Sequence, residues 1–469
     1  MDSSNYRIEH DLLGQRHVPA NQYYGIHTLR ALENFSITGI SIQNYPDIIN
    51  GLAFVKEACA LANNQLGILD DNLTSAITRS CQEIRSGLLH EYFVVDSIQG
   101  GAGTSTNMNA NEVIANRSLE ILGHELGSYN HLHPLEHVNL SQSTNDVYPT
   151  AVKVALRFAI ERLALAMDVL REDFEKKSIE FTDVLKMGRT QLQDAVPMTL
   201  GQEFSTYAVM LLEDQQRLWE AALLIQEINL GATAIGTGIN SPEGYSQLAC
   251  QALTQLTGFK FLTADNLVEA TQDAGAFVQL SGVLKRVAVK LSKVCNDLRL
   301  LSSGPRAGLG EINLPAVQAG SSIMPGKVNP VIPEVVNQVA FEVIGNDVTV
   351  TFAAEAGQLQ LNAFEPIIAR SLLDSLIHLR QACITLAEKC VRGITANRDR
   401  LNDIMKLTIG IVTALNPYIG YENATQVASE AYATGRSVSD IVLEKALLTP
   451  EKLNEILRPE NLTHPMIKN

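Results

Sequence analysis

The sequence predicts a mostly α-helical protein built around a bundle of long helices. Apolar residues recur in alternating steps of three and four over residues 277–301, which is the spacing of one face of a long helix. A second stripe of this kind runs through residues 152–174, and further long helical candidates cover about 200–230, 333–354 and 358–390. At about 1.5 Å per residue, the helix over 277–301 alone would span about 36 Å.

These segments define the expected domain organisation. Long helices bury an apolar seam best against one another, so we expect the bundle to occupy residues 146–395. Residues 1–145 mix short helices with turn-rich stretches such as SIQGGAGTSTNMNANE, and residues 396–469 are expected to form a small helical C-terminal domain. The stripes carry Ala, Val and Leu on more than one face, which is typical of helices buried on several sides. We therefore expect bundles from several subunits to pack together.

Charge and composition exclude several classes of partner and location. The net charge of −15 opposes binding to nucleic acids or anionic membranes. The N-terminus lacks the apolar core of a secretory signal, and no apolar run approaches the ~18 residues of a membrane span. The six cysteines are scattered without a CxxC pair, which favours reduced thiols over disulfides or zinc. These features predict a cytoplasmic protein.

Four loops between the helical segments are rich in small polar residues, the most unusual being GSSIMPGKVNP at 320–330. That loop is not a phosphate-binding P-loop, because five residues separate its glycines and Val328 follows the lysine where Ser or Thr is required. Each loop taken alone could simply cap a helix or make a turn. Brought together, they would supply many neutral donors and a cation, which suits a small dianionic ligand. The residues are Thr104 to Asn107 and Asn109; Ser143, Thr144 and Asn145; Thr190 and Gln191; and Ser321, Ser322, Lys327 and Asn329.

Other candidate sites are weaker. The segment HLHPLEH contains His131, His133 and His137, but its spacing fits no zinc signature. The motifs HExxH, GxSxG and GxGxxG after a strand are absent from the sequence. The segment SEAYATGRSVSDIVLEK imitates a DNA-binding helix-turn-helix, but it lacks a basic stripe and favours two packed helices, with Ser437 as a cap.

The loop GSSIMPGKVNP resembles the signature loop of the fumarase/aspartase superfamily, whose members eliminate a group from a succinate-like skeleton to give fumarate. The resemblance extends through YYGIHTLRALENF, GAGTSTNMNANEV, SQSTNDVYPT, GRTQLQDAVPMTLGQEF and RLLSSGPRAGLGEINLP, and so covers essentially the whole chain. It implies a long-helix bundle assembled as a homotetramer, with each active site drawing loops from three chains.

The resemblance also implies roles for individual residues. Ser321 would be the general base that removes the Cβ proton. Other residues would bind the substrate: Thr104, Ser143, Thr144 and Ser322 the β-carboxylate; Thr190, Lys327 and Asn329 the α-carboxylate; and Asn145 the amine. Arg30, in YYGIHTLRA, matches an arginine near the active site and would help to hold a carboxylate.

Variants within the motifs favour one branch of the superfamily. GAGTSTN, STND and NPVIPEVVNQ differ from the forms typical of the hydratases, and Gln191 stands where many relatives carry a histidine. Hydroxide needs a proton donor in order to leave, whereas an ammonium group leaves as neutral ammonia unaided. The expected reaction is therefore the reversible deamination of L-aspartate to fumarate and ammonia. The alternatives are a malate/fumarate hydratase and a catalytically silent scaffold. The resemblance implies no organic cofactor and allows Mg²⁺ as an activator, without identifying ligands.

Overall fold

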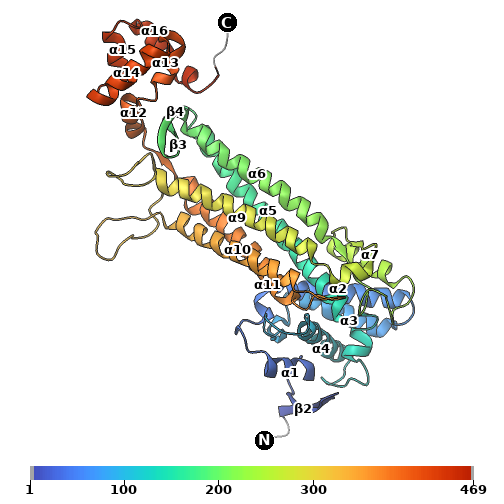
Figure 1. Ribbon diagram of the computed structural model, residues 1–469. Helices are drawn as coiled ribbons and strands as arrows, with labels where there is room; N and C mark the ends of the chain where they lie inside the picture. Colours follow the sequence, from blue (N-terminus) through green and yellow to red (C-terminus); the bar gives the residue numbers. More distant parts are fainter. Residues whose placement is uncertain (1–4, 466–469) are drawn as a thin grey trace. The chain divides into compact units, whose positions relative to one another are not determined.

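The computed structural model describes residues 5–465, and these residues are mostly helical (Figure 1). The chain divides into two compact units. The first unit comprises Met1–Ala164, Gln216–Arg286 and Phe341–Leu379, and the second unit comprises Leu165–Gln215, Val287–Ala340 and Arg380–Asn469.

Five long helices contribute a segment to both units, and they confirm the predicted fold class. They are α5 (Thr144–Glu180), α6 (Leu200–Ile225), α9 (Gly275–Leu301), α10 (Val331–Glu355) and α11 (Glu365–Lys389). Within the first unit, the Ser281 hydroxyl of α9 donates to Asp347 of α10 at 2.8 Å. Within the second unit, the Asn337 amide of α10 donates to the Ser292 hydroxyl of α9 at 2.8 Å. The apolar stripe over 277–301 is buried in α9, with Leu280, Leu284 and Leu298 at most 1% exposed.

The first unit also contains the N-terminal helices and two small sheets. The strands β1 (Tyr6–Asp11) and β2 (Gly14–Pro19) pair antiparallel, with Ile8 opposite His17, and β5 (Glu227–Ile228) pairs parallel with β6 (Leu262–Thr263). The helices are α1 (Ile26–Asn34), α2 (Pro46–Gln65), α3 (Asp71–Arg85), α4 (Thr104–Ile121), α7 (Tyr245–Thr257) and α8 (Leu267–Gln272). The core of α2 includes Ile49, Leu52 and Val55, each 0% exposed.

The second unit adds two sheets and the C-terminal helices. The antiparallel hairpin of β3 (Leu185–Thr190) and β4 (Gln193–Thr199) precedes α6, and β7 (Ile312–Asn313) pairs antiparallel with β8 (Thr395–Ala396). The helices are α12 (Arg398–Leu407), α13 (Val412–Ile419), α14 (Tyr421–Thr434), α15 (Val438–Glu444), α16 (Pro450–Ile456) and α17 (Pro459–Leu462). Helices α14 and α15 are the segment that imitates a DNA-binding motif. They pack around a buried apolar cluster, and Ser437 caps α15 by accepting from the Asp440 amide at 3.1 Å.

Two local predictions were wrong. Residues 104–111 were predicted to be turn-rich, but they are helical: α4 begins at Thr104, directly after Gly103, which has a left-handed conformation. Polar residues are tolerated in this buried helix because residues of nearby loops form hydrogen bonds with their side chains. For example, Asn109 accepts from the Val94 amide and donates to the Tyr92 carbonyl. The candidate helix over 358–390 begins only at residue 365, because Asn362 holds the preceding segment out of the helix: its side chain donates to the Ala353 and Ala354 carbonyls of α10 and accepts from the Phe364 amide.

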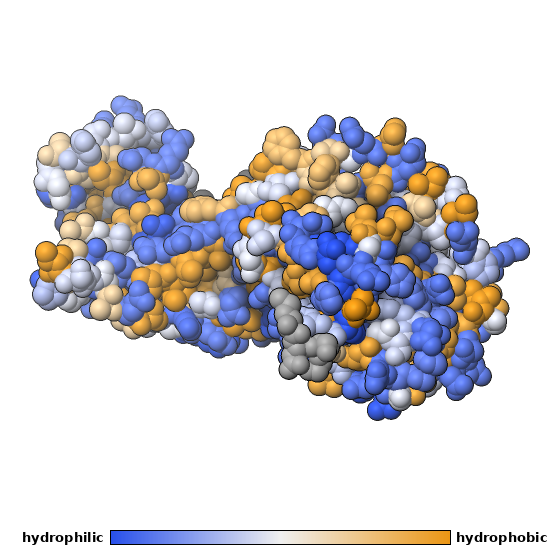
Figure 2. Space-filling view, turned by 90° about the horizontal axis from the view of Figure 1, so that it is seen from below, coloured by the Kyte–Doolittle hydropathy of each residue, from blue (hydrophilic) through white to orange (hydrophobic). Residues whose placement is uncertain are grey.

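Large apolar side chains also reach the surface of the long helices. Figure 2 shows hydrophobic residues interspersed among hydrophilic ones over the face that it presents. On α10 alone, Phe341 is 63% exposed and Phe352 is 69% exposed. None of the helices in residues 5–465 is long and apolar enough to cross a membrane.

Candidate active site

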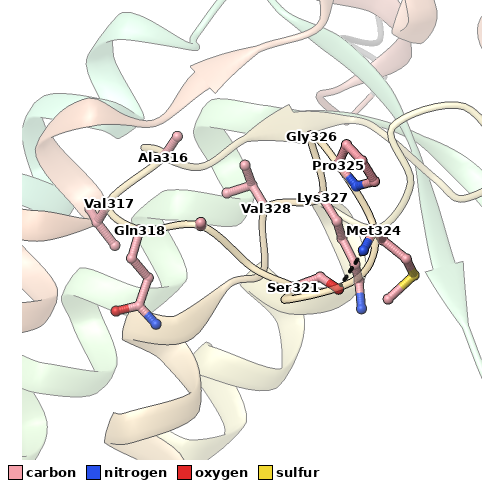
Figure 3. A pocket seen from close by; sticks show the side chains of 10 residues that line it. Ala316, Val317, Gln318, Ser321, Met324, Pro325, Gly326, Lys327 and Val328 are labelled. Atoms are coloured by element: carbon pink, nitrogen blue, oxygen red, sulfur yellow. Dashed lines mark hydrogen bonds between the residues drawn. The ribbon is translucent and has the colours of Figure 1, made fainter.

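The loop over residues 320–330, which we call the signature loop, lies in the second unit and bounds a cavity of about 570 Å³ (Figure 3). Its two ends are tied together. The Gly320 amide donates to the Lys327 carbonyl at 2.8 Å, and the Asn329 side chain donates to the Gly320 carbonyl at 2.6 Å. A Cβ at position 320 would lie 2.6 Å from the Lys327 carbonyl oxygen, so this close approach requires glycine.

Ser321 lies inside this loop, half-buried against the cavity. Its Oγ accepts hydrogen bonds from the amides of Met324 at 3.0 Å and Ile323 at 3.2 Å (Figure 3 shows the side-chain arrangement). Hydrogen bonds donated to an oxygen favour its anionic form. The two amides are therefore placed to stabilise negative charge on the serine oxygen.

The remaining residues of the signature loop surround Ser321. Lys327 lines the same cavity and also a second cavity of about 490 Å³, which it shares with Asn329 and Arg299. Ser322 is exposed and is not among the residues lining either cavity. The loop therefore presents one hydroxyl and one cation to a common space.

Thr190 and Gln191 lie at the exposed tip of the β3–β4 hairpin. The two turn residues, Gln191 and Leu192, have φ values of 53° and 62°, the left-handed conformation that such a short hairpin turn requires. For residues other than glycine or asparagine this costs about 1–2 kcal/mol each. The base of the hairpin is held by Lys186, whose Nζ lies 3.0 Å from the fully buried carboxylate of Glu311.

In the first unit, the SQSTND motif forms the N-terminus of α5. The backbone amide of Asn145 donates to the Ser143 hydroxyl at 3.3 Å, and the backbone amide of Ser143 donates to Asp146 Oδ1 at 3.0 Å. Together these bonds form a reciprocal helix cap. Because Pro149 has no N–H, the Asn145 carbonyl is free to accept from the Asn229 side chain at 3.0 Å. The side-chain amide of Asn145 donates to the Ala234 carbonyl at 2.7 Å.

The Thr144 hydroxyl oxygen accepts from the Asn107 side-chain amide of α4 at 3.1 Å. Ser143 Oγ likewise accepts from a backbone amide. A hydroxyl whose oxygen already accepts a bond keeps its own hydrogen for another partner. Both hydroxyls are therefore suited to donate to a carboxylate. By contrast, the Thr104 hydroxyl at the start of α4 donates to the Gly101 carbonyl at 2.7 Å.

Sequence reasoning missed Lys56 of α2, which is 0% exposed. Its Nζ donates to Asn139 Oδ1 at 2.9 Å and to Gln142 Oε1 at 2.8 Å. Because an ammonium group only donates, Asn139 must present its oxygen to Lys56, and that oxygen then accepts from Asn107 at 3.2 Å. Lys56 thus sets the direction of the chain of hydrogen bonds that ends at Thr144. A lysine in the apolar stretch GLAFVKEACALA is the signal that could have revealed it.

Burial perturbs two ionisable groups beneath this motif. Desolvation lowers the pKa of Lys56 to about 7, opposed by the charges of Cys59, Asp146 and Cys81. Desolvation raises the pKa of Asp146 to about 6, opposed by hydrogen bonds from the amides of Ser143, Thr233 and Gly231. Titratable groups with shifted pKa values therefore lie directly behind the candidate binding residues.

Arg30 of α1 forms a two-pronged ion pair with Asp11 of β1, at 2.6 and 2.7 Å, and also donates to the Gly14 carbonyl. The guanidinium hydrogen bond holds the pKa of Asp11 below its usual value. In this structure Arg30 therefore fastens the β1–β2 hairpin, and its contact with a substrate stays a prediction.

The histidine-rich segment serves local structure. His133 Nδ1 accepts from the amides of Leu135 and Glu136, and the His133 amide donates to His137 Nδ1 at 2.8 Å. The His131 ring stacks on His124, with 3.8 Å between centroids. Throughout residues 5–465, no group of three or more His, Cys, Asp or Glu side chains could hold a metal ion.

The candidate residues thus form two clusters. The first unit brings Ser143, Thr144 and Asn145 together at one helix terminus, supported by Asn107 and Lys56. The second unit brings together Ser321, Lys327 and Asn329 in the signature loop, and carries Thr190 and Gln191 on the hairpin.

Comparison with known proteins gives consistent matches over the whole chain. A family model described as "Lyase" matches residues 14–345, and one described as "Fumarase C C-terminus" matches residues 411–464. The chain is 58% identical over 459 residues to the aspartate ammonia-lyase of Helicobacter pylori, covering 98% of each chain. It is 55% identical over 467 residues to that of Escherichia coli, covering 99% of this chain and 98% of the relative.

Solved structures of lyases also match this chain over nearly its whole length. A fumarate lyase:delta crystallin from Brucella melitensis, bound to cobalt, superposes with a TM-score of 0.96 at 54% identity, covering 98% of this chain and 100% of that one. A class II fumarase from Schistosoma mansoni superposes with a TM-score of 0.92 at 36% identity, covering 97% and 98%.

Proposed function

This chain belongs to the fumarase/aspartase superfamily of lyases, and from that premise we propose that it catalyses the reversible deamination of L-aspartate to fumarate and ammonia. The observation that carries this assignment is the near-full-length similarity to aspartate ammonia-lyases at 55–58% identity. The hydratase alternative is less favoured, because the fumarase comparison reaches only 36% identity.

In the proposed mechanism, Ser321 is the general base. A proton on the carbon next to a carboxylate is weakly acidic, so its removal requires a strongly basic oxygen and a stabilised product anion. The amides of Ile323 and Met324 support the anionic form of Ser321 Oγ, and the cation of Lys327 lines the same cavity. The serine oxygen takes the Cβ proton, and the electron pair of that C–H bond stays on the substrate.

The resulting charge is placed on the β-carboxylate as an aci-carboxylate. We assign its stabilisation to Thr104, Ser143, Thr144 and Ser322. Support comes from Ser143 and Thr144, whose oxygens already accept hydrogen bonds and leave their hydrogens for the substrate. A preorganised donor aimed at developing charge contributes about 3–4 kcal/mol.

The second step breaks the C–N bond. The electron pair forms the C=C bond of fumarate, and the ammonium group leaves as neutral ammonia. Asn145 places the amine, and Thr190, Lys327 and Asn329 bind the α-carboxylate, with Arg30 and Gln191 nearby. Since neutral ammonia needs no proton in order to leave, Gln191 has no acid–base task.

We further propose a homotetramer in which each active site combines residues from different chains. The exposed apolar side chains of α10 support this, because Phe341, Val348 and Phe352 recur at helical spacing along one face, and such a stripe is typical of a surface that another subunit covers. Ser321 and Thr144 also lie in different units of the chain.

The cellular location and the cofactors complete the proposal. The six cysteines are all buried and free, which suits a reducing cytoplasmic compartment. No organic cofactor is required, and the resemblance to this superfamily allows magnesium as an activator. The described residues provide no three-ligand cluster for such an ion, so no step is assigned to it.

The test of the proposed function is to mix the purified protein with L-aspartate and, separately, with L-malate, and to follow the ultraviolet absorbance of fumarate. A rise with L-aspartate and none with L-malate is expected. A rise with L-malate alone would make the protein a hydratase, and no rise with either would leave a silent scaffold.

A further inference from the structure

A small cavity of about 150 Å³ in the first unit adjoins the SQSTND motif, and of the residues that line it only Ser143 has a role in the mechanism above. One wall is formed by the residues that lead into α5, and the opposite wall by the loop after β5. Its lining consists of Ser141, Gln142, Ser143, Thr233, Ala234, Ile239 and Asn240. The volume corresponds to a few water-sized molecules, since each occupies about 30 Å³ in the liquid.

The two walls are fastened to each other by hydrogen bonds. The Asp146 carboxylate accepts from the Ser143 amide on one wall, and from the amides of Gly231 and Thr233 at 3.0 and 2.9 Å on the other. The side chain of Asn145 bridges to the Ala234 carbonyl at 2.7 Å. The cavity is therefore a built feature, held by the same residues that present Ser143 and Asn145.

Backbone strain is concentrated around this cavity. Nine residues other than glycine have positive φ in residues 5–465, and three of them, Ser141, Thr233 and Asn240, line it at 61°, 55° and 66°. For a β-branched residue such as Thr233 this conformation is a genuine outlier. Strain of this kind persists where function requires a particular geometry.

Two hydroxyls at the cavity also lack partners. Ser141 is 7% exposed and Thr233 is 5% exposed, and the buried hydroxyl oxygen of each has no hydrogen-bond partner among residues 5–465. A buried hydroxyl left unsatisfied is unfavourable, so each of these two lining residues would gain from a ligand that bonds its hydroxyl.

The lining decides the chemical class of the ligand. None of the seven residues is charged, so a carboxylate would find no cation and an ammonium ion no direct counter-charge. The hydroxyls and the side-chain amide of Asn240 can both donate and accept, whereas the Gln142 side chain is already bonded to Lys56 and to the carbonyls of Val138 and Leu140. Such a lining suits a small neutral molecule that both donates and accepts hydrogen bonds. Neutral ammonia, the amine product of the proposed reaction, is a molecule of this kind.

We propose that this cavity receives neutral ammonia as it leaves the substrate carbon and supplies it in the reverse reaction. The inference rests on the proposed deamination and extends it, because it assigns a separate binding site to the second product. Ser141 and Thr233 would hydrogen-bond ammonia without touching the dicarboxylate.

The test is the apparent KM for ammonia in the amination of fumarate. The variants Thr233→Val, which keeps the side-chain shape, and Ser141→Ala each remove one hydroxyl. Each is expected to raise the KM for ammonia by about tenfold, the loss of one hydrogen bond, while the KM for fumarate changes less than about twofold. Thr233→Ser, which keeps the hydroxyl, should retain the native value.

Thr150→Val is the matched control, because Thr150 also has a buried, unpartnered hydroxyl but does not line the cavity. Both of its KM values should stay native. If Thr233→Val does not fold, Ser141→Gly provides the hydroxyl deletion without left-handed strain. An unchanged KM for ammonia in a folded variant, or a rise only in the KM for fumarate, overturns the inference while leaving the deamination intact. Failure of the native protein to deaminate L-aspartate removes both.

Discussion

The buried residues that contact the SQSTND motif determine which groups of the candidate site donate hydrogen bonds and which accept them. In its ammonium form Lys56 can only donate. This fixes the Asn139 oxygen as an acceptor, so Asn107 donates both to Asn139 and to the oxygen of Thr144. The Thr144 hydrogen is thereby left for the substrate. A buried cation thus shapes a binding group that it does not touch.

Reversing one link of this chain tests the idea. In Asn107→Asp, a carboxylate replaces the donor, so the Thr144 hydroxyl would turn its hydrogen toward residue 107 and away from the substrate. We expect the KM for L-aspartate to rise by at least about tenfold. The matched control is Asn111→Asp, because Asn111 also donates to Asn139 but makes no contact with Thr144. Equal effects of both variants on KM would contradict the role of Thr144.

The burial of Lys56 predicts a pH-dependent stability. Desolvation lowers its pKa to about 7 in the folded protein, whereas the unfolded chain keeps the ordinary value near 10.5. Between these values the unfolded state binds the extra proton, so stability rises with pH, by up to about 1.4 kcal/mol per pH unit. Below about pH 7 both states are protonated, and the full cost of burying the charge remains.

Denaturant unfolding from about pH 8 to about pH 10 measures this contribution in the native protein and in Lys56→Met. The variant should lose this positive slope, whatever its overall stability. The window lies above the pKa of about 6 of the neighbouring Asp146, so that carboxyl adds no slope there. Identical slopes in the two proteins would show that Lys56 does not titrate in this range.

At the scale of elements, the signature loop depends on its closure by Gly320. A Cβ at this position would meet the backbone of Lys327 and Asn329 at 2.6 and 2.8 Å. We expect Gly320→Ala to force the loop open and to lower kcat by more than about tenfold, because misplacing a catalytic group by about 1 Å is costly. Thermal stability should change little, since the loop is mostly exposed.

The comparison variant is Gly326→Ala in the same loop, where a Cβ would meet nothing within 4 Å. This variant should retain more activity than Gly320→Ala, because its only penalty is the strain of an alanine at the left-handed φ of 78°. Equal losses in both variants would point to general loop flexibility instead of the specific closure.

The long helices could be predicted because apolar periodicity records burial directly. The stripe over 277–301 became α9 almost residue for residue. The start of α4 could not be predicted, because its Thr and Asn residues favour turns locally and only tertiary partners such as Tyr92 satisfy them in a helix. The late start of α11 could not be predicted for a similar reason, because Asn362 holds the preceding residues through contacts that a local pattern does not reveal.

The candidate site was predictable in part. The loop motifs identified Ser321, Lys327 and Thr144, since small polar residues clustered at helix ends are visible in sequence. Lys56 and Asp146 were missed, because their importance comes from burial and from contacts between distant segments. The pairing of Arg30 with Asp11 was likewise invisible until the β1–β2 hairpin was placed.

For the whole molecule, the proposal of shared sites makes a distinct prediction. Ser321→Ala and Thr144→Val should each be nearly inactive alone. If every site combines these residues from different chains, unfolding and refolding a mixture should create some sites with both native residues, and activity should rise well above the mean of the two variants. Light scattering should give four times the mass of one chain. A monomer, or a mixture no more active than its components, would contradict shared sites.

The central claim is that Ser321 removes the Cβ proton of L-aspartate. The most direct measurement compares native protein with Ser321→Ala for steady-state fumarate formation and for binding of a non-reactive dicarboxylate. We expect kcat to fall by several orders of magnitude while the dicarboxylate binds with nearly native affinity, because the serine acts on the proton and not on the carboxylates. Native turnover in Ser321→Ala would contradict the assignment and require another base.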